Sequence, residues 1–443
     1  MQKRDTLFIG FMLFALFFGA GNLIYPPFLG YEAGTSFWKA IGGFVITGVG
    51  LPIMAVAAIA LVRGGANALG SRVSPLFGLV FTAVVYLAIG PFFGIPRGAN
   101  VAYEMAVKPF TETGGFSSAL ALFLFTVVFF LLSYWVSLNP TRLVDRIGQL
   151  LTPVLLISIT ALVAVSFVKL DAPLQPASEK YQSAPFFTGL IEGYLTMDTI
   201  AAFAFAILVV TAVTEKGVSN HRTLMGHTVR AGLVAGAGLA AVYISIGWLG
   251  AKMASLGSFT NGSEILSAGA NLLFGSFGGL LLGAIVALAC FTTVVGLTTA
   301  SAQYFSKQFP KLGYKNVVTL VSIVSFLIAN LGLNQIIAYS VPVLVAVYPL
   351  AIVLVLLAYL HNLFGGTRYV YSGAMLATGI VSVYDGLKML GLESEYLTQF
   401  LGSLPLASLS LAWVMPAAAG GAAGFLLSML KKDPASETAN SRI

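Results

Sequence analysis

The chain has 443 residues, of which 58% are hydrophobic and only 9% are charged, and its mean hydropathy is +0.92. Soluble proteins carry about 25% charged residues, so this composition excludes an ordinary soluble protein and predicts one built for the lipid bilayer. A net charge of +7 would suggest a nucleic-acid partner in a soluble protein. In a membrane protein it is explained by basic loops on one face, so we expect no nucleic-acid partner.

Apolar segments long enough to cross about 30 Å of hydrocarbon recur along the whole chain. They predict about twelve spans, near residues 6–29, 37–62, 75–98, 116–137, 148–169, 186–213, 229–252, 276–304, 316–333, 336–359, 369–390 and 405–430. Most of these segments are hydrophobic on all sides, unlike the core helices of soluble domains. We therefore expect an all-α membrane protein whose single transmembrane domain covers residues 1–430, followed by a polar tail over residues 431–443.

The Lys and Arg residues predict the orientation of these spans. Placing the N-terminus in the cytoplasm puts most of the 23 basic residues in cytoplasmic loops. This bias fits the positive-inside rule. An even number of spans returns the C-terminus to the same side, so we expect both termini to be cytoplasmic.

The first apolar segment contains Phe17-Phe18-Gly19-Ala20-Gly21-Asn22-Leu23-Ile24-Tyr25-Pro26-Pro27. Glycine weakens helical order, and proline withholds a backbone N–H. In a bilayer, broken backbone survives only where protein or a wet cavity receives its polar groups. We interpret this stretch as an interrupted helix whose free N–H and C=O groups form a binding site. The alternative is a Gly/Pro kink that serves packing only.

The sixth span contains Glu192-Gly193-Tyr194-Leu195-Thr196-Met197-Asp198-Thr199 before the apolar run 200–213. Charged residues at depth usually face a cavity or a partner, and the apolar run alone is too short to cross. Two interrupted spans that lie five spans apart and run in opposite directions are typical of inverted-topology repeats. We expect repeats of five helices over residues 6–169 and 186–359, with two additional helices over 369–430. This arrangement resembles the leucine-transporter fold.

The eighth and third spans carry further polar residues. Thr292 and Thr293 lie near mid-depth, where their hydroxyls either bond back to the preceding turn or offer oxygen to a small cation such as sodium. In the third span, Pro91 and Pro96 predict kinks. Arg97 and Glu104 are expected near its outer end, either as a gate pair or as an ordinary surface salt bridge.

Two weaker patterns concern packing. Residues 264–274 predict a short helix across the outer mouth, which serves either as a lid or as an interfacial packing element. Glycines four residues apart, at 232 and 236 and at 420 and 424, let helices approach closely and predict tight helix packing.

Three motifs together resemble the bacterial branched-chain amino acid:cation symporter family, and the resemblance covers essentially the whole chain. The motifs are Phe18-Gly19-Ala20-Gly21-Asn22-Leu23-Ile24-Tyr25-Pro26-Pro27, Gly90-Pro91 to Arg97, and Thr196-Met197-Asp198. The resemblance implies the leucine-transporter fold of the amino acid-polyamine-organocation superfamily. It also implies import of leucine, isoleucine and valine with sodium across the bacterial cell membrane.

The resemblance also implies roles for individual residues. The substrate carboxylate would bind the N–H groups of Ala20 and Gly21 within the Gly19–Asn22 break, at the positive end of a half-helix. Asn22 would match a ligand of a second sodium site of the fold, but one sodium is expected. The resemblance further implies a sodium site formed by the carbonyls of Ala15 and Phe18 with Thr292 and Thr293.

In the sixth span, the resemblance implies that the substrate ammonium binds the backbone of Gly193, Tyr194, Leu195 and Thr196. Asp198 would help by its charge or fix the broken helix. Aromatic walls of the side-chain pocket are expected at Phe92, Phe93 and Tyr194.

These expectations lead to one hypothesis with rivals. The chain is expected to be a sodium-coupled symporter for branched-chain amino acids that works by alternating access, with sodium as coupling ion, no other cofactor and no obligate protein partner. The alternative is a proton-coupled amino acid transporter or an exchanger, with Asp198 or Glu192 as the titrating group. A channel and an amino acid sensor are further rivals. An enzyme is not expected, because the chain has no His/Asp/Glu cluster or Ser–His pair at catalytic spacing.

Overall fold

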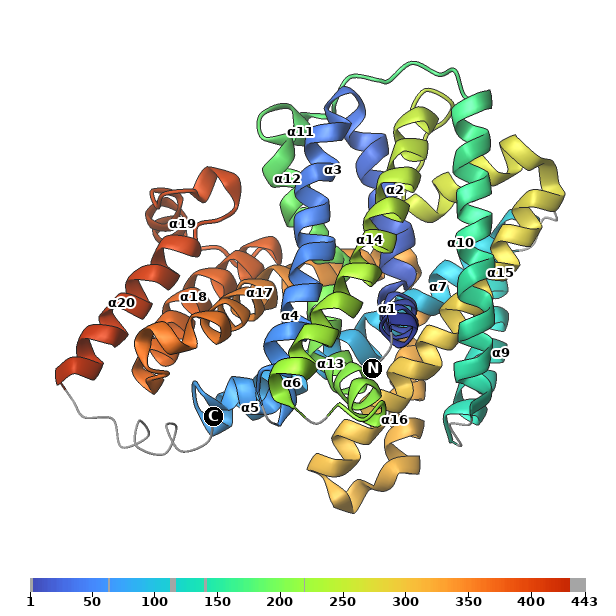
Figure 1. Cartoon of the computed structure of the whole chain (residues 1–443). Coiled ribbons are helices and arrows are strands. Elements are labelled where there is room, and N and C mark those ends of the chain that lie inside the picture. Colours follow the sequence, from blue (N-terminus) through green and yellow to red (C-terminus); the bar gives the residue numbers. More distant parts are fainter. Residues whose placement is uncertain (1–2, 63, 112–116, 139–141, 219, 431–443) are drawn as a thin grey trace.

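The computed structural model describes residues 3–62, 64–111, 117–138, 142–218 and 220–430, and every regular element in these ranges is a helix (Figure 1). Seven helices of the described part are long and apolar enough to cross a membrane, or eight if the bent pair Asp198–Ala206 and Leu208–Glu215 forms one span. The predicted class, an all-α membrane protein, is confirmed. The predicted tail over 431–443 lies outside the described residues.

The predicted apolar ranges fall mainly on helix, although in 405–430 the α-helix begins only at Val414, and several spans consist of more than one piece. The helices of the first half are α1 (Lys3–Phe17), α2 (Ala20–Ala33), α3 (Phe37–Val45), α4 (Leu51–Ala60), α5 (Gly65–Ser71), α6 (Pro75–Leu87), α7 (Gly94–Ala106), α8 (Lys108–Thr111), α9 (Ser118–Leu138), α10 (Arg142–Lys169), α11 (Glu179–Gln182), α12 (Pro185–Glu192) and α13 (Asp198–Glu215). Those of the second half are α14 (His221–Met253), α15 (Gly262–Gln308), α16 (Gly313–Ala329), α17 (Leu333–Leu360), α18 (Arg368–Met389), α19 (Glu395–Gly402) and α20 (Val414–Leu430).

Shorter helical pieces join or interrupt these helices. The π-helical turns are η2 (Ile46–Gly50) and η3 (Ala88–Phe92), and the 3-10 turns are η1 (Gly34–Ser36), η4 (Gly193–Thr196), η5 (Pro310–Leu312), η6 (His361–Phe364) and η7 (Ala407–Leu409). Fewer helices of the described part pass as full-length spans than the sequence predicts: the first span is divided at Gly19, and Leu156–Lys169 and Val414–Leu430 count as shorter apolar helices.

The first span is interrupted where the sequence predicts it. Helix α1 ends at Phe17, and Gly19 has extended backbone (φ −123°, ψ −166°) before α2 begins. The Gly19 N–H donates to Asn22 Oδ1 at 3.3 Å, so the asparagine caps the start of α2. Pro26 and Pro27 lie inside α2 and do not end it. The stretch is therefore a true interruption and not a simple proline kink.

The sixth span is interrupted as well. Helix α12 gives way to the 3-10 turn η4, and Met197 then adopts a left-handed conformation (φ 71°) before α13 starts at Asp198. A non-glycine residue with positive φ is uncommon and usually needs support from its surroundings. Both predicted interruptions are thus present, while the division into two repeats over 6–169 and 186–359 stays a prediction.

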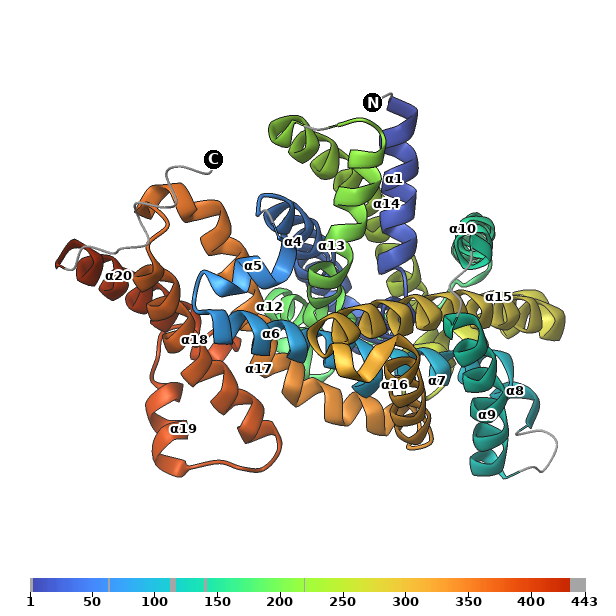
Figure 2. The same ribbon diagram turned by 90° about the horizontal axis from the view of Figure 1, so that it is seen from below.

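The interrupted helices lie at the centre of the helix assembly. Helix α2 packs against α14, α12 against α3, α13 against α4, and α7 against α15. Figure 2 shows α1 running beside α14, in agreement with their contacts. Helices α17, α18 and α20 pack in sequence on one side of this centre (Figure 1).

Glycines set the closest helix approaches, as the sequence predicts. A Cβ on Gly420 would lie 2.3 Å from Gly373 O, and one on Gly424 would lie 2.2 Å from Tyr369 O, so α20 lies directly on the α18 backbone. Cβ atoms on Gly232 and Gly236 would lie 2.8 and 2.3 Å from the nearest side-chain atoms of α4. These positions hold helices together by close van der Waals contact.

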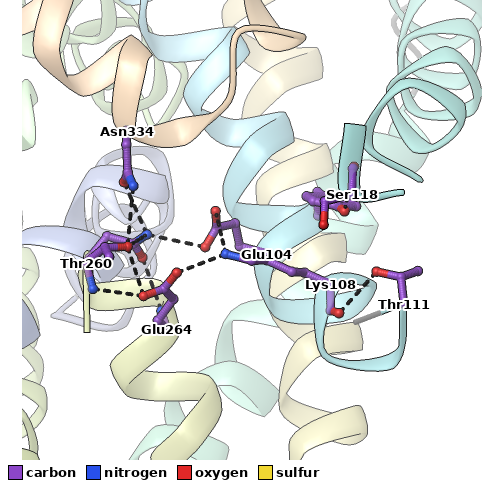
Figure 3. Close-up of polar contacts among 9 residues, drawn as sticks. Glu104, Lys108, Thr111, Ser118, Thr260, Glu264 and Asn334 are labelled. Atoms are coloured by element: carbon purple, nitrogen blue, oxygen red, sulfur yellow. Dashed lines mark hydrogen bonds and ion pairs between the residues drawn. The ribbon is translucent and has the colours of Figure 1, made fainter. Parts of the chain in front are cut away.

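The predicted helix over 264–274 is the first arm of α15, which bends at Gly275 (φ 70°, ψ −176°). Lys108 Nζ, at the start of α8, pairs with Glu264 at 2.9 Å and with Glu104 of α7 at 3.4 Å (Figure 3). Asn261 Nδ2 donates to Glu104 and to Asn334 at 3.3 Å each, which adds the start of α17. These contacts make the arm a packed element.

A test of this packing uses two glycines on neighbouring helices. A Cβ on Gly30 of α2 would lie 1.8 Å from Gly247 O of α14, whereas one on Gly42 of α3 meets nothing within 4 Å. We expect Gly30→Ala to destabilise the protein by about 1–3 kcal/mol through overpacking. Gly42→Ala, the matched control, should leave stability unchanged or raise it by up to about 1 kcal/mol. Thermal unfolding of the purified variants in detergent measures both, and equal melting temperatures would contradict the proposed α2–α14 contact.

Candidate functional site

A cavity of about 50 Å³ lies where the two interrupted helices meet. Its lining comes from the first, third and sixth spans and from α15: Leu16, Phe17, Gly19, Ala20, Gly21, Asn22, Ile89, Gly94, Arg97, Thr196, Met197, Asp198, Ala201, Phe205, Thr293 and Leu297. Polar backbone of the interruptions and apolar side chains therefore face the same space. Such a mixture is typical of small-molecule sites.

The structure brings part of the predicted site together here. The predicted residues that line the cavity are Gly19, Ala20, Gly21, Asn22, Thr196, Asp198 and Thr293. The predicted residues outside its lining are Ala15, Phe18, Phe92, Gly193, Tyr194, Leu195 and Thr292. Apart from Thr293 of α15, the first group consists of residues at the two interruptions, where the sequence signal is local.

The start of α2 presents backbone donors to the cavity. The N–H groups of Ala20 and Gly21 belong to the first turn and have no acceptor within the helix. The helix dipole adds partial positive charge there. A Cβ on Gly21 would lie 2.6 Å from Arg97 Nη2 and 2.8 Å from Thr196 O, so glycine allows the two interruptions to approach each other.

Asp198 joins three helices through a buried hydrogen-bond network. Its Oδ2 accepts from Asn22 Nδ2 at 2.8 Å and from the Tyr243 hydroxyl at 2.8 Å, and Asn22 also contacts Tyr243. Asp198 is only 3% exposed. This carboxylate therefore ties α13 to α2 and α14, as expected of a residue that fixes the broken helix. Tyr243 was not predicted, because it is one aromatic residue among many in an apolar span.

Arg97 corrects the sequence prediction for the third span. It is 3% exposed and lines the cavity, so it is neither at the outer end of the span nor paired with Glu104. Its Nη1 donates to Leu195 O at 3.0 Å and its Nη2 to Thr196 O at 3.2 Å. Glu104 lies two turns further along α7 and pairs with Lys108 instead. The side chain reaches inward because Arg97 belongs to the first turn of α7, directly after η3.

The remaining residues of the sixth-span prediction have packing roles in the structure. A Cβ on Gly193 would lie 2.0 Å from Thr47 Oγ1, so this glycine lets η4 pack against η2. Tyr194 stacks on Tyr348 with ring centroids 4.8 Å apart. Glu192 pairs with Lys180, which also binds Glu32 at 3.2 Å, and Glu192 does not line the cavity.

The aromatic wall differs from the prediction. Phe92 is 40% exposed and is not among the residues that line the cavity. The centroid of its ring lies 6.4 Å from that of its neighbour Phe93. Phe92 is the last residue of the π-helical turn η3, which separates α6 from α7. A π-helical turn changes the helical register, so the side chains after it face other directions than a continued α6 would give them. Phe17, Phe205 and Leu297 provide apolar walls instead. Their contribution depends on which helix faces meet, and sequence periodicity alone does not settle that.

Two hydroxyls of α15 share one carbonyl acceptor, and one of them belongs to a threonine beside the first interruption. Thr292 Oγ1 and Thr293 Oγ1 both donate to Ala289 O, at 2.8 and 3.1 Å. This is the back-bonding expected of threonine in a membrane helix, and it leaves hydroxyl lone pairs for a further partner. A Cβ on Gly19 would lie 3.5 Å from Thr293 Cγ2, so this threonine packs against the break. Ala289 was not predicted, because a backbone carbonyl carries no sequence signal.

Comparisons with known proteins agree with this architecture. The branched-chain amino acid permease BraB of Bacillus subtilis (strain 168) is 46% identical over 431 residues, which cover 97% of this chain and 96% of the relative. The branched-chain amino acid transport system 2 carrier protein of Pseudomonas aeruginosa is 42% identical over 417 residues, with 94% of each chain covered.

The fold has a counterpart among solved structures. Mhp1, a nucleobase-cation-symport-1 family transporter in a closed conformation with bromovinylhydantoin bound, matches with a TM-score of 0.61 at 15% identity, covering 97% of this chain and 93% of its own. This likeness confirms the predicted leucine-transporter type of fold. The family model described as branched-chain amino acid transport protein matches residues 2–431. The chain therefore belongs to the family of branched-chain amino acid transport proteins.

Proposed function

We propose that this protein is a sodium-coupled symporter that imports leucine, isoleucine and valine across the bacterial cell membrane by alternating access. The observation that carries the proposal is the cavity between two interrupted helices, where free backbone donors, a carboxylate and apolar walls face one another. The printed names of the relatives support branched-chain amino acids as the substrate class. The bias of the basic residues supports cytoplasmic placement of both termini.

The cavity offers complementary groups for each part of an aliphatic amino acid. The N–H groups of Ala20 and Gly21 suit the carboxylate, because helix N-termini bind anions. Asp198 suits the ammonium, because its carboxylate lines the cavity and attracts a positive charge. Phe205 and Leu297 suit the branched side chain, which gains free energy by leaving water.

A sodium ion would bind where α15 meets the first interruption. Its proposed ligands are the carbonyls of Ala15 and Phe18 and the hydroxyls of Thr292 and Thr293, whose lone pairs stay available while both hydroxyls donate to Ala289 O. Substrate and sodium would then both bind the same interruption of the first span. Two ligands that stabilise one arrangement of the same backbone raise each other's affinity, which couples transport to the sodium gradient.

Proton coupling is the competing mechanism, and the buried Asp198 favours it, since a carboxylate removed from water is a natural proton acceptor. Glu192 is a weaker candidate because it already pairs with Lys180.

Uptake of labelled leucine into liposomes containing the purified protein separates the two mechanisms. An inward sodium gradient at equal pH on both sides should drive accumulation, and isoleucine and valine should compete. Accumulation driven by a pH gradient in sodium-free buffer would instead establish proton coupling. Exchange without net accumulation under either gradient would establish an exchanger.

Substituting the α15 hydroxyls tests the sodium site. Thr293→Ala and Thr292→Ala each remove one oxygen ligand, so the sodium concentration for half-maximal uptake should rise by about tenfold or more. Thr378→Ala is the matched control, because Thr378 lies in α18 away from the cavity and, like Thr293, donates to a carbonyl four residues earlier, Ala374 O at 2.7 Å. The sodium dependence of leucine uptake is the measurement, and unchanged dependence in both test variants would remove this site from the mechanism.

A pair of glycine substitutions tests the carboxylate site. Gly21→Ala places a methyl group 2.6 Å from Arg97 Nη2, whereas the nearest atom to a Cβ on Gly19 is 3.5 Å away, an ordinary contact. We expect Gly21→Ala to weaken leucine binding by about tenfold or more through overpacking, and Gly21→Leu to abolish it. Gly19→Ala should bind leucine nearly normally. Binding of labelled leucine to the purified variants decides the matter, and normal affinity in Gly21→Leu would refute the assignment.

A further inference from the structure

Arg97 is a buried cation that takes part in none of the substrate contacts proposed above. Its side chain lies over the Tyr25 ring at 5.5 Å, and its Nη1 also reaches the Tyr25 hydroxyl at 3.4 Å. The Arg97 Nε lies buried and has no hydrogen-bond partner among the described residues. No carboxylate of the described part forms an ion pair with Arg97. A buried guanidinium held only by neutral groups retains both charge and a free donor.

The guanidinium lies beside the donors of α2. Its Nη2 is 2.6 Å from the position of a Cβ on Gly21, next to the N–H groups at the start of that helix. Two independent sources of positive potential therefore meet at one edge of the cavity: the helix N-terminus and a full positive charge. An anion placed there would gain charge-assisted hydrogen bonds from both.

The same contacts limit where the substrate ammonium can bind. Arg97 already occupies the carbonyl oxygens of Leu195 and Thr196. A second cation on these oxygens would be repelled by the guanidinium. Asp198 lines the cavity and carries the opposite charge, so the ammonium belongs on its side.

We propose that Arg97 is a specificity-determining residue that recognises the carboxylate of the transported amino acid, together with the N–H groups of Ala20 and Gly21. The substrate then lies with its carboxylate toward Arg97 and its ammonium toward Asp198. This assignment rests on the proposed function, and it explains why a zwitterionic amino acid is selected over an amine of the same shape. It goes beyond a structural role in which Arg97 only joins α7 to the sixth span.

The test compares leucine with leucinamide, which keeps the ammonium and the side chain but replaces the carboxylate by a neutral amide. Both ligands compete against labelled leucine on the purified full chain, at about pH 6, where both amino groups are protonated. In the wild type, leucine should bind about tenfold to hundredfold more tightly than leucinamide. In Arg97→Gln, leucine binding should weaken by a similar factor while leucinamide binding stays unchanged, so that the preference disappears.

Arg72→Gln is the matched control. Arg72 also hydrogen-bonds neutral partners, His361 at 3.1 Å and the Tyr371 hydroxyl at 2.9 Å, but it does not line the cavity. Its substitution should leave the ratio of the two affinities unchanged. Arg97→Lys keeps the positive charge but lacks the planar guanidinium, so its preference for leucine over leucinamide should lie between those of the wild type and Arg97→Gln. If Arg97→Gln does not fold, this variant tests the inference instead.

The outcomes separate the inference from the proposed function. Equal losses for leucine and leucinamide in Arg97→Gln would show that Arg97 is a structural connector, and this would overturn the inference alone. Equal binding of both ligands by the wild type would overturn it without any variant. Failure of the wild type to bind leucine, isoleucine or valine would overturn the proposed function and this inference with it.

Discussion

The structure depends on one constraint: inside a bilayer, every backbone N–H and C=O group must find a partner in the protein or in an enclosed aqueous space. Two spans of this chain violate helical continuity, and each relies on the other for compensation. Asn22 caps the start of α2 and also binds Asp198 at the start of α13. Arg97 takes the carbonyls of Leu195 and Thr196 that the turn η4 leaves available. The interruptions are therefore one polar unit assembled from four spans.

This polar unit contains two opposite charges that are not paired with each other. Asp198 is held by Asn22 and Tyr243, and Arg97 by backbone carbonyls and Tyr25. Neutral partners stabilise each charge without cancelling it, so both retain the capacity to bind a further ion. In a low-dielectric interior such an arrangement matches a zwitterion more closely than a simple cation or anion. The separation of charge is thus the feature on which the proposed amino acid recognition rests.

Around this unit, the scaffold is held by close glycine contacts and by ion pairs at the helix ends. Lys180 joins Glu32 of α2 to Glu192 of α12, and Lys108 joins α7 to the first arm of α15. Lys180 thereby links the two interrupted spans to each other. Any movement of α2 relative to α12 has to separate or carry these pairs, so the proposed alternating access involves them.

The sequence by itself determined the helical membrane class and the positions of both interruptions, because segment length, glycine, proline and isolated polar residues act locally. It also indicated that Asp198 lies deep, since the apolar run after it is too short to cross alone. Only the tertiary structure decided which side chains meet at the cavity. Arg97 and Glu104 lie seven residues apart, about 10 Å along a helix. Glu104 pairs locally with Lys108, four residues along the chain, whereas Arg97 turns inward to the carbonyls of Leu195 and Thr196 and Phe92 stays outside the cavity lining. The inward position of Arg97 depends on contacts between helices far apart in the chain, which no local pattern encodes.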